Sequence, residues 1–167
     1  MPAAKQLAFD IDGPDATSSV LLELINSFPG LGTKTVEFST LEENSGIGFF
    51  PTNGAVILSE KEDILGHVTQ ICLYPFTVVY RAAPKTDRQK VKIKEFLDAL
   101  GRWLERQPVT VSGTEHRLTA YPALQSGDRT IKSISRTSPA YMEKAYNDGV
   151  EDWSIEARLT YENKFSR

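Results

Sequence analysis

The residues most suited to catalysis stand near the start of the sequence. Phe9, Asp10, Ile11, Asp12 and Gly13 place an apolar stretch directly before an Asp-x-Asp-Gly motif. In such a motif the first carboxylate can attack a phosphoryl group as a nucleophile, while both carboxylates help to hold Mg²⁺. One hypothesis is therefore a small magnesium-dependent phosphatase-like enzyme.

This motif resembles the opening motif of haloacid dehalogenase-type phosphatases, and Asp148 and Asp152 could supply the distal acidic pair of that family. However, Pro14 stands where the family has a hydroxyl residue, and Lys5 and Gln6 shorten the preceding strand. The sequence also lacks the parallel alternation of strands and helices that this fold requires. A mobile or turn-forming N-terminus explains these residues better than an active site does.

The remaining reactive residue types form no catalytic pattern. His67 and His116 are interpreted as surface or strand-end residues, because no G-x-S-x-G motif supplies a nucleophile for them. Cys72 lies in an apolar segment, which favours a buried, inert thiol. A single cysteine forms no intrachain disulfide, and no Cys/His cluster has the spacing of a zinc site. We therefore expect no catalytic residue, no metal and no cofactor.

Composition is that of an ordinary globular domain. The chain has 167 residues, of which 40% are hydrophobic and 25% are charged, so one domain with a packed core is expected. No apolar run reaches the roughly 18–20 residues of a membrane span, and the N-terminus lacks the features of a secretory signal. A soluble, cytoplasmically made protein without a membrane partner is expected. The net charge of −3 argues against binding nucleic-acid phosphates over the whole surface.

Apolar periodicity predicts two amphipathic helices. The first is expected to begin near Asp15, with Thr17, Ser18 or Ser19 as its cap, and to end at Pro29. The second is expected over residues 87–106, where apolar residues recur at i, i+3, i+4 and i+7. Because each helix has one apolar stripe, both must pack against a larger element, and a sheet is expected.

Several segments have the alternation or the β-branched content of strands. A strand is expected over residues 35–40, a central strand over 67–82, and further strands over 130–135 and 151–162. Pro75 lies inside the central segment and implies an edge, a bulge or two successive strands. Residues 109–128 are expected to carry one short strand at most.

This order of elements favours one α+β domain, in which two helices pack on one face of a mostly antiparallel or mixed sheet. We expect residues 1–15 to form an N-terminal arm and residues 16–167 the domain. Within the domain, residues 41–65 are expected to form a loop insertion, with room for two short strands and a protruding loop.

Charge is unevenly distributed along the chain. Residues 81–106 contain eight basic and four acidic side chains, whereas residues 37–63 contain six acidic and one basic. A solvated helix face explains the basic stretch, and an alternative is that this helix meets the acidic region of a neighbouring subunit. The resulting interface candidates are Glu42, Glu43, Glu60, Glu62, Asp63, Lys90, Lys94 and Arg102.

Three segments together resemble a family of virion proteins. They are residues 76–82 (FTVVYRA), residues 98–107 (DALGRWLERQ) and residues 131–165, in which the last strand carries Trp153, Ile155, Arg158, Leu159 and Tyr161. With this pattern of core positions, the sequence resembles the tail-terminator and minor capsid proteins of tailed phages and prophages of low-GC Gram-positive bacteria. The helix containing Leu21, Leu22 and Ile25 fits the same pattern.

The resemblance implies a structural role without catalytic residues. It implies a ring, usually of six subunits, that caps the tail tube and offers a surface to the head connector, while genomic DNA passes through the lumen without specific binding. A ring larger than a dimer needs heterologous, head-to-tail contacts. The acidic candidates are then expected near the lumen or the stacking faces, where they would let phosphates slide. Another neck or head-completion component and an unrelated interaction domain are the alternatives.

Overall fold

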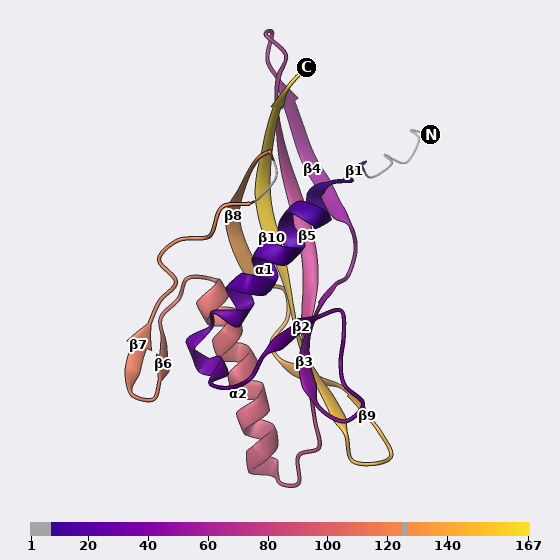
Figure 1. The fold of residues 1–167 in the computed structure, drawn as a ribbon, viewed down its shortest axis with the longest axis vertical. Helices are drawn as coiled ribbons and strands as arrows, with labels where there is room; N and C mark the ends of the chain where they lie inside the picture. The colour runs from indigo at the N-terminus through magenta and orange to yellow at the C-terminus, as the bar shows by residue number, and fades with distance from the viewer. Residues whose placement is uncertain (1–7, 125–126) are drawn as a thin grey trace.

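Two long antiparallel strands run through the centre of the molecule. The computed structural model describes residues 8–124 and 127–167. Within it, β5 (His67–Ala82) and β10 (Glu151–Ser166) pair over their whole length, with Glu151 opposite Ala82 and Ser166 opposite His67. These strands follow the long axis of the molecule (Figure 1). At about 3.3 Å per residue they span roughly 50 Å.

Shorter strands line both outer edges of this pair. On the β5 side, β3 (Gly46–Pro51) and β4 (Ala55–Glu62) lie end to end, β2 (Val36–Phe38) pairs in parallel with β3, and β1 (Ala8–Asp10) pairs with β4. On the β10 side lie β8 (Asp128–Arg136) and β9 (Tyr141–Ala145). The sheet is therefore mixed and mostly antiparallel, which confirms the predicted α+β class.

The prolyl residue in the middle of β5 is accommodated by a break in the neighbouring strand. Pro75 is part of one continuous strand and lies opposite Arg158 of β10. Its ring nitrogen, which has no hydrogen to donate, faces the gap between β3 and β4, where its carbonyl accepts a hydrogen bond from Thr52 N at 3.1 Å. The strand is therefore not divided at Pro75.

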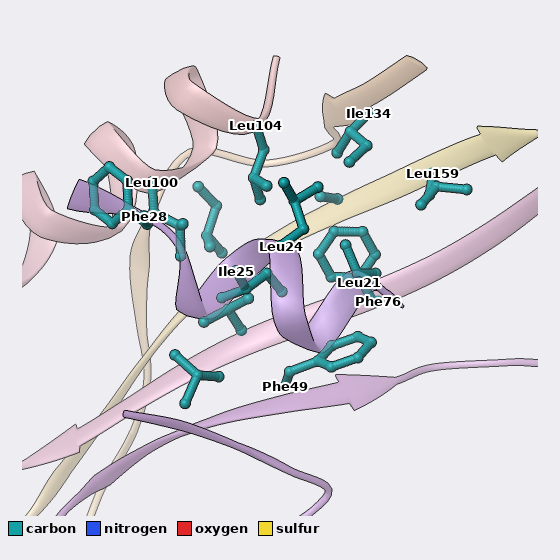
Figure 2. Close-up of a cluster of buried hydrophobic side chains, with 14 of the residues drawn as sticks. Leu21, Leu24, Ile25, Phe28, Phe49, Phe76, Leu100, Leu104, Ile134 and Leu159 are labelled. Carbon is teal, nitrogen blue, oxygen red and sulfur yellow. The ribbon is translucent and has the colours of Figure 1, made fainter. Parts of the chain in front are cut away.

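Both helices cover the same face of the sheet. Helix α1 (Gly13–Asn26) and helix α2 (Asp87–Leu104) point apolar side chains at Phe76 of β5 and Leu159 of β10 (Figure 2). The short helix η1 (Pro29–Leu31) follows α1, and Phe28 packs its ring on Trp103 of α2 at a centroid distance of 5.4 Å. Thr86 caps α2 by accepting a hydrogen bond from Gln89 N.

Several local expectations differ from the structure. Helix α1 begins at Gly13 with Asp12 as its N-cap residue, so the predicted start near Asp15 and the predicted hydroxyl cap are wrong, because Pro14 suits the first turn of a helix. Residues 8–15, expected in an arm, form β1 and the first turn of α1, while residues 1–7 lie outside the described residues.

The other differences concern short strands. The segment at residues 41–65, expected as a loop insertion with room for two short strands, holds β3 and β4, so the two strands are confirmed; both pair with β5, and β3 places Ile47 and Phe49 in the core rather than in an insertion outside it. Residues 109–128, expected to hold one short strand at most, hold the hairpin of β6 (Val109–Val111) and β7 (Thr114–His116). Three-residue strands are too short to produce a visible alternation in sequence.

Candidate interaction surfaces

The Asp-x-Asp-Gly motif forms the end of a strand and the start of a helix. Asp10 is the last residue of β1 and is buried. Its carboxylate accepts hydrogen bonds from Arg129 Nε at 2.9 Å, Arg129 Nη2 at 2.8 Å and the Tyr161 hydroxyl at 2.6 Å. Gly13 is required here, because a Cβ at that position would collide with the Tyr161 hydroxyl and with Ala55. This cluster joins the first described strand to β8 and β10.

The protonation of this cluster is fixed by its partners. Burial would raise the pKa of Asp10, but the hydrogen bonds from Arg129 and Tyr161 outweigh burial and hold that pKa below its ordinary value. Burial and the bond to Asp10 both raise the pKa of Tyr161, so the phenol stays protonated as the donor. Asp10 is thus an ionised, fully engaged carboxylate, which makes it a structural group.

The acidic residues of the phosphatase hypothesis do not converge. Asp12 is exposed at the N-cap of α1, and Asp148 accepts a hydrogen bond from Val150 N at 3.1 Å. Asp152 pairs with Arg81 of β5, whereas the β1 strand that ends at Asp10 lies beside β4 at the level of Leu73 of β5. Arg81 and Leu73 are eight residues apart on this extended strand, a distance of roughly 26 Å. Among the described residues, no three or more His, Cys, Asp or Glu side chains are grouped to hold a metal ion.

A second charged cluster surrounds Asp152 on the opposite face of the sheet from the helices. Asp152 accepts hydrogen bonds from Arg81 Nε at 2.7 Å, Arg81 Nη2 at 2.9 Å and the Tyr146 hydroxyl at 2.9 Å. The hydrogen bond from Arg81 lowers the pKa of Asp152. The cluster borders an open groove of about 490 Å³ that Phe50 and Val79 also line.

The acidic interface candidates lie at two opposite ends of the molecule. Glu42 and Glu43 precede β3, where Gly46 pairs with Arg81, and the Glu42 carbonyl accepts a hydrogen bond from Arg81 Nη1. Glu60, Glu62 and Asp63 lie where β4 ends and β5 begins. The intervening residues run in extended form along β5, so proximity in sequence does not bring these carboxylates together.

The basic candidates lie along α2 and are partly engaged within the subunit. Lys90 Nζ is 3.1 Å from a carboxylate oxygen of Glu151, and Lys94 Nζ is 2.7 Å from one of Asp98. Arg102 is exposed on the last turn of the helix. Asp98 also accepts a hydrogen bond from Ala140 N at 3.0 Å, so these charges help to fasten α2 to the rest of the domain.

The histidines and the cysteine lie as the sequence indicates. His67 begins β5 and its Nδ1 is 2.9 Å from Asp63 Oδ2, and His116 ends β7. Cys72 is completely buried in β5, and burial raises its pKa to about 11, which confirms the predicted buried thiol.

Sequence reasoning did not single out two features at opposite ends of the long axis. One is the apolar tip of the β4–β5 hairpin, where Ile64 and Leu65 are fully or largely exposed. The other is a groove of about 430 Å³ beside the start of α2, bordered by Lys34 and Lys92. The sequence Asp-Ile-Leu-Gly between two polar strand ends is the local signal that would have indicated an exposed apolar turn.

The fold is similar to that of solved structures only at a distance. A chain from a structure described as the virion of a native gene transfer agent particle superposes with a TM-score of 0.49 and 8% sequence identity, over 93% of this chain and 100% of that chain. No family model matches the sequence. No curated protein matches it either. Within residues 8–124 and 127–167, neither helix has the length and hydrophobicity to cross a membrane.

Proposed function

We propose that this protein is a structural subunit of a phage-like particle, and specifically a tail terminator that assembles into a ring on the end of the tail tube. In this role it binds further copies of itself, the tail tube protein and the head-tail connector. Genomic DNA passes through its lumen, and the protein resides in the virion tail or neck. The ring is expected to be a hexamer.

The observation that carries this proposal is that the three segments that resemble the family lie together in the fold. Residues 76–82 belong to β5, and β5 pairs along its length with β10, which contains the last part of the segment 131–165. Residues 98–107 belong to α2 and its C-terminal end, and polar contacts bind them to residues 131–165. Glu105 accepts hydrogen bonds from Arg136 Nε at 2.8 Å and Arg136 N at 3.1 Å, and Asp98 accepts one from Ala140 N at 3.0 Å.

Packing within this unit is also specific. Gly101 of α2 lies against Ile155 of β10 and Arg136 of β8, so closely that a Cβ at position 101 would collide with both. The three segments therefore form one continuous helix-on-sheet unit rather than three unrelated matches. Such a unit is what a shared pattern of core positions requires.

The acidic residues at the two ends of the molecule suggest how the subunit is oriented in the ring. Glu42 and Glu43 lie near one end of β5, and Glu60, Glu62 and Asp63 lie near the other. If the long axis of the subunit is parallel to the channel, both stacking faces of the ring carry carboxylates that repel passing phosphates. A ring structure with these residues entirely on the outer wall would contradict this arrangement.

Electron microscopy of particles made without the protein is the decisive experiment. The gene is deleted from a propagating phage or inducible prophage that encodes it, and the wild-type gene supplied in trans is the control. Overlong tails without attached heads are expected, because nothing stops tube growth. Tails of normal length that fail to join heads would indicate a connector component instead, and normal infectious particles would refute both roles.

Assembly on the tube is tested in solution. The mass of the purified protein is measured by light scattering with and without tail tube protein, and a ring-sized increase in the presence of tube is expected. A protein that binds neither itself nor the tube would contradict the proposed function.

A further inference from the structure

The two helices leave one face of the sheet bare, and this bare face lies directly behind α2. Val79 and Tyr80 are consecutive residues of β5, so their side chains point to opposite faces. Tyr80 packs its ring on Phe96 of α2 at a centroid distance of 5.4 Å, whereas Val79 lines the open groove of about 490 Å³ on the bare face. The helix and the groove therefore lie at the same level of the long axis, and a neighbour displaced sideways would bring its helix to this groove.

The half of the helix face nearer the β4–β5 hairpin is negative. Figure 1 shows α1 in this half and α2 in the other. Residues 8–33 contain no Lys or Arg, and Asp10 in this range is paired with Arg129. Three exposed acidic side chains remain on α1 and its N-cap: Asp12, Asp15 and Glu23. This half therefore carries a net charge of −3.

The half of the helix face that α2 forms is positive. Residues 85–104 contain six basic and three acidic side chains. Lys34 borders the same half, because it lines a groove together with Lys92, and Glu151 pairs with Lys90 at 3.1 Å. With Lys34 and Glu151 included, seven basic and four acidic side chains give this half a net charge of +3.

The bare face carries the opposite charges at the same two levels. Directly paired residues of neighbouring strands share a face of the sheet, so the strand register identifies the charged residues of this face. In the half behind α1 four are basic and two are acidic, a net charge of +2: Lys61, Lys132, Arg158, Lys164, Asp128 and Glu162. In the half behind α2 four are acidic and two are basic, a net charge of −2: Glu37, Glu143, Asp152, Glu156, Arg81 and Lys144. Glu42 and Glu43, at the adjoining end of the molecule, add to the negative charge of this half.

We propose that the helix face of one subunit packs on the bare sheet face of a second copy of this chain, with both subunits pointing the same way and without displacement along the long axis. The negative α1 half then meets the positive half of the bare face, and the positive α2 half meets the negative half. A neighbour turned end for end on this face would bring like charges together in both halves.

This contact joins two different faces, so it repeats from subunit to subunit and closes a ring whose channel is parallel to the long axis. The inference deepens the proposed function and rests on it for the choice between two kinds of contact. A twofold dimer in which two helix faces meet would also pair α1 with α2. Such a dimer leaves both bare faces uncovered and forms no ring, so the proposed function favours the contact of helix face with bare face.

Two exposed positions at one level of the long axis can report this contact. Val91 is 52% exposed on α2 and follows Lys90, whose Nζ reaches Glu151 of β10. Lys144 of β9 is the register partner of Asp152, which is the next residue of β10, and it lies on the bare face. In the proposed packing, Val91 of one subunit and Lys144 of its neighbour therefore lie at the same level on facing surfaces.

Cross-linking with a short bis-maleimide tests the contact. A helix partner, the full chain with Val91→Cys, is mixed with a sheet partner, the full chain with Lys144→Cys, in the presence and absence of tail tube protein. The native Cys72 is completely buried and does not compete. Linked dimers are expected from the mixture and from neither partner alone. Leu58→Cys, at a position 53% exposed on β4, replaces Val91→Cys to set the chance level.

A mixture that stays at this chance level under both conditions overturns the proposal. Equal linking of the helix partner with itself also overturns it, because that result indicates a dimer of two helix faces.

Charge exchange in the α2 half tests the electrostatic match. Arg88→Glu in the helix partner is expected to lower the dimer yield roughly 10-fold, because it places like charges across the contact. Glu37→Lys in the sheet partner is expected to restore the yield when the two variants are mixed. The matched control is Arg117→Glu in the helix partner, because Arg117 is exposed and belongs to neither charged face. An equal loss from Arg88→Glu and Arg117→Glu, or no restoration by Glu37→Lys, overturns the proposal.

Charge exchange in the α1 half tests the register of the packing. Glu23→Lys in the helix partner is expected to lower the dimer yield, and Arg158→Glu in the sheet partner to restore it. Restoration in the α2 half alone overturns a packing without displacement along the long axis. Circular dichroism confirms that each variant remains folded. If the partners do not link while deletion of the gene still gives overlong tails, the contact is refuted and the proposed function stands. If they link while the deletion leaves normal particles, the contact stands and the proposed function is refuted.

Discussion

Two Asp–Arg–Tyr clusters in this protein use the same bonds at different depths. In each, an Arg donates through Nε and Nη2 to one carboxylate, and a tyrosine hydroxyl donates to the same Oδ2. Asp10 is the acceptor in one cluster and Asp152 in the other. The same set of side-chain hydrogen bonds therefore occurs in two different settings.

Both carboxylates are buried, so the settings differ in the burial of the tyrosine and the arginine and in the chain segments that are joined. Tyr161 is completely buried, whereas Tyr146 is half-buried beside an open groove. Arg129 lies 119 residues from Asp10, while Tyr146 lies six residues from Asp152 and Arg81 is the cross-strand partner of Asp152. The Asp10 cluster thus closes the fold by joining β1 to β8 and β10, which lie far from it in sequence. The Asp152 cluster reinforces strands that backbone hydrogen bonds already pair.

The largest effect is expected from Asp10→Asn. The substitution keeps the shape of the side chain but removes the buried charge that Arg129 and Tyr161 both contact, and breaking such a pair costs about 3 kcal/mol of unfolding free energy. Urea denaturation at neutral pH measures it. Asp12→Asn is the matched control, because Asp12 is exposed two residues away. Equal losses in both variants would show that the cluster does not close the fold.

The pH dependence of stability tests whether Asp10 stabilises the fold as a carboxylate. The pKa of Asp10 is lower in the folded than in the unfolded chain, so its contribution to stability is complete above the ordinary value of about 3.9 and is lost as pH falls through the folded value. The difference in unfolding free energy between the wild type and Asp10→Asn should therefore narrow below about pH 4. A difference that stays constant down to the acid transition would contradict this assignment.

Removal of the buried phenol is expected to have a smaller effect. Tyr161→Phe deletes the hydroxyl that donates to Asp10 at 2.6 Å but keeps the ring, so the loss is about 2 kcal/mol, as for a hydrogen bond to a charged group. Thermal unfolding monitored by circular dichroism measures it. Tyr74→Phe is the control within the same core, because its hydroxyl bonds only the neutral Ser18. A larger loss from Tyr74→Phe would refute the special role of the carboxylate.

What the sequence reveals follows from how far apart the interacting residues lie. Helix α2 and strand β10 are predictable because their apolar residues repeat over many turns or alternations. Strand β1 has three residues, and its anchor Arg129 is 119 residues away, so no local pattern indicates it. The acidic candidates Glu42 and Glu62 appear close in sequence, but an extended chain along β5 separates them. Periodicity thus predicts elements, whereas long-range polar contacts need the fold.

The smallest effect is expected from Asp152→Asn. The bonds that Asp152 accepts are as short as those of Asp10, but Arg81 is more exposed than Arg129 and solvent can replace part of the lost interaction. A loss of about 1 kcal/mol in urea denaturation is expected, at the upper end for partly exposed ion pairs. Because the clusters lie far apart and share no residue, the double variant Asp10→Asn, Asp152→Asn should lose the sum of the single losses to within about 0.5 kcal/mol. A loss from Asp152→Asn that equals that of Asp10→Asn would mean that burial and chain separation do not set the strength of these clusters.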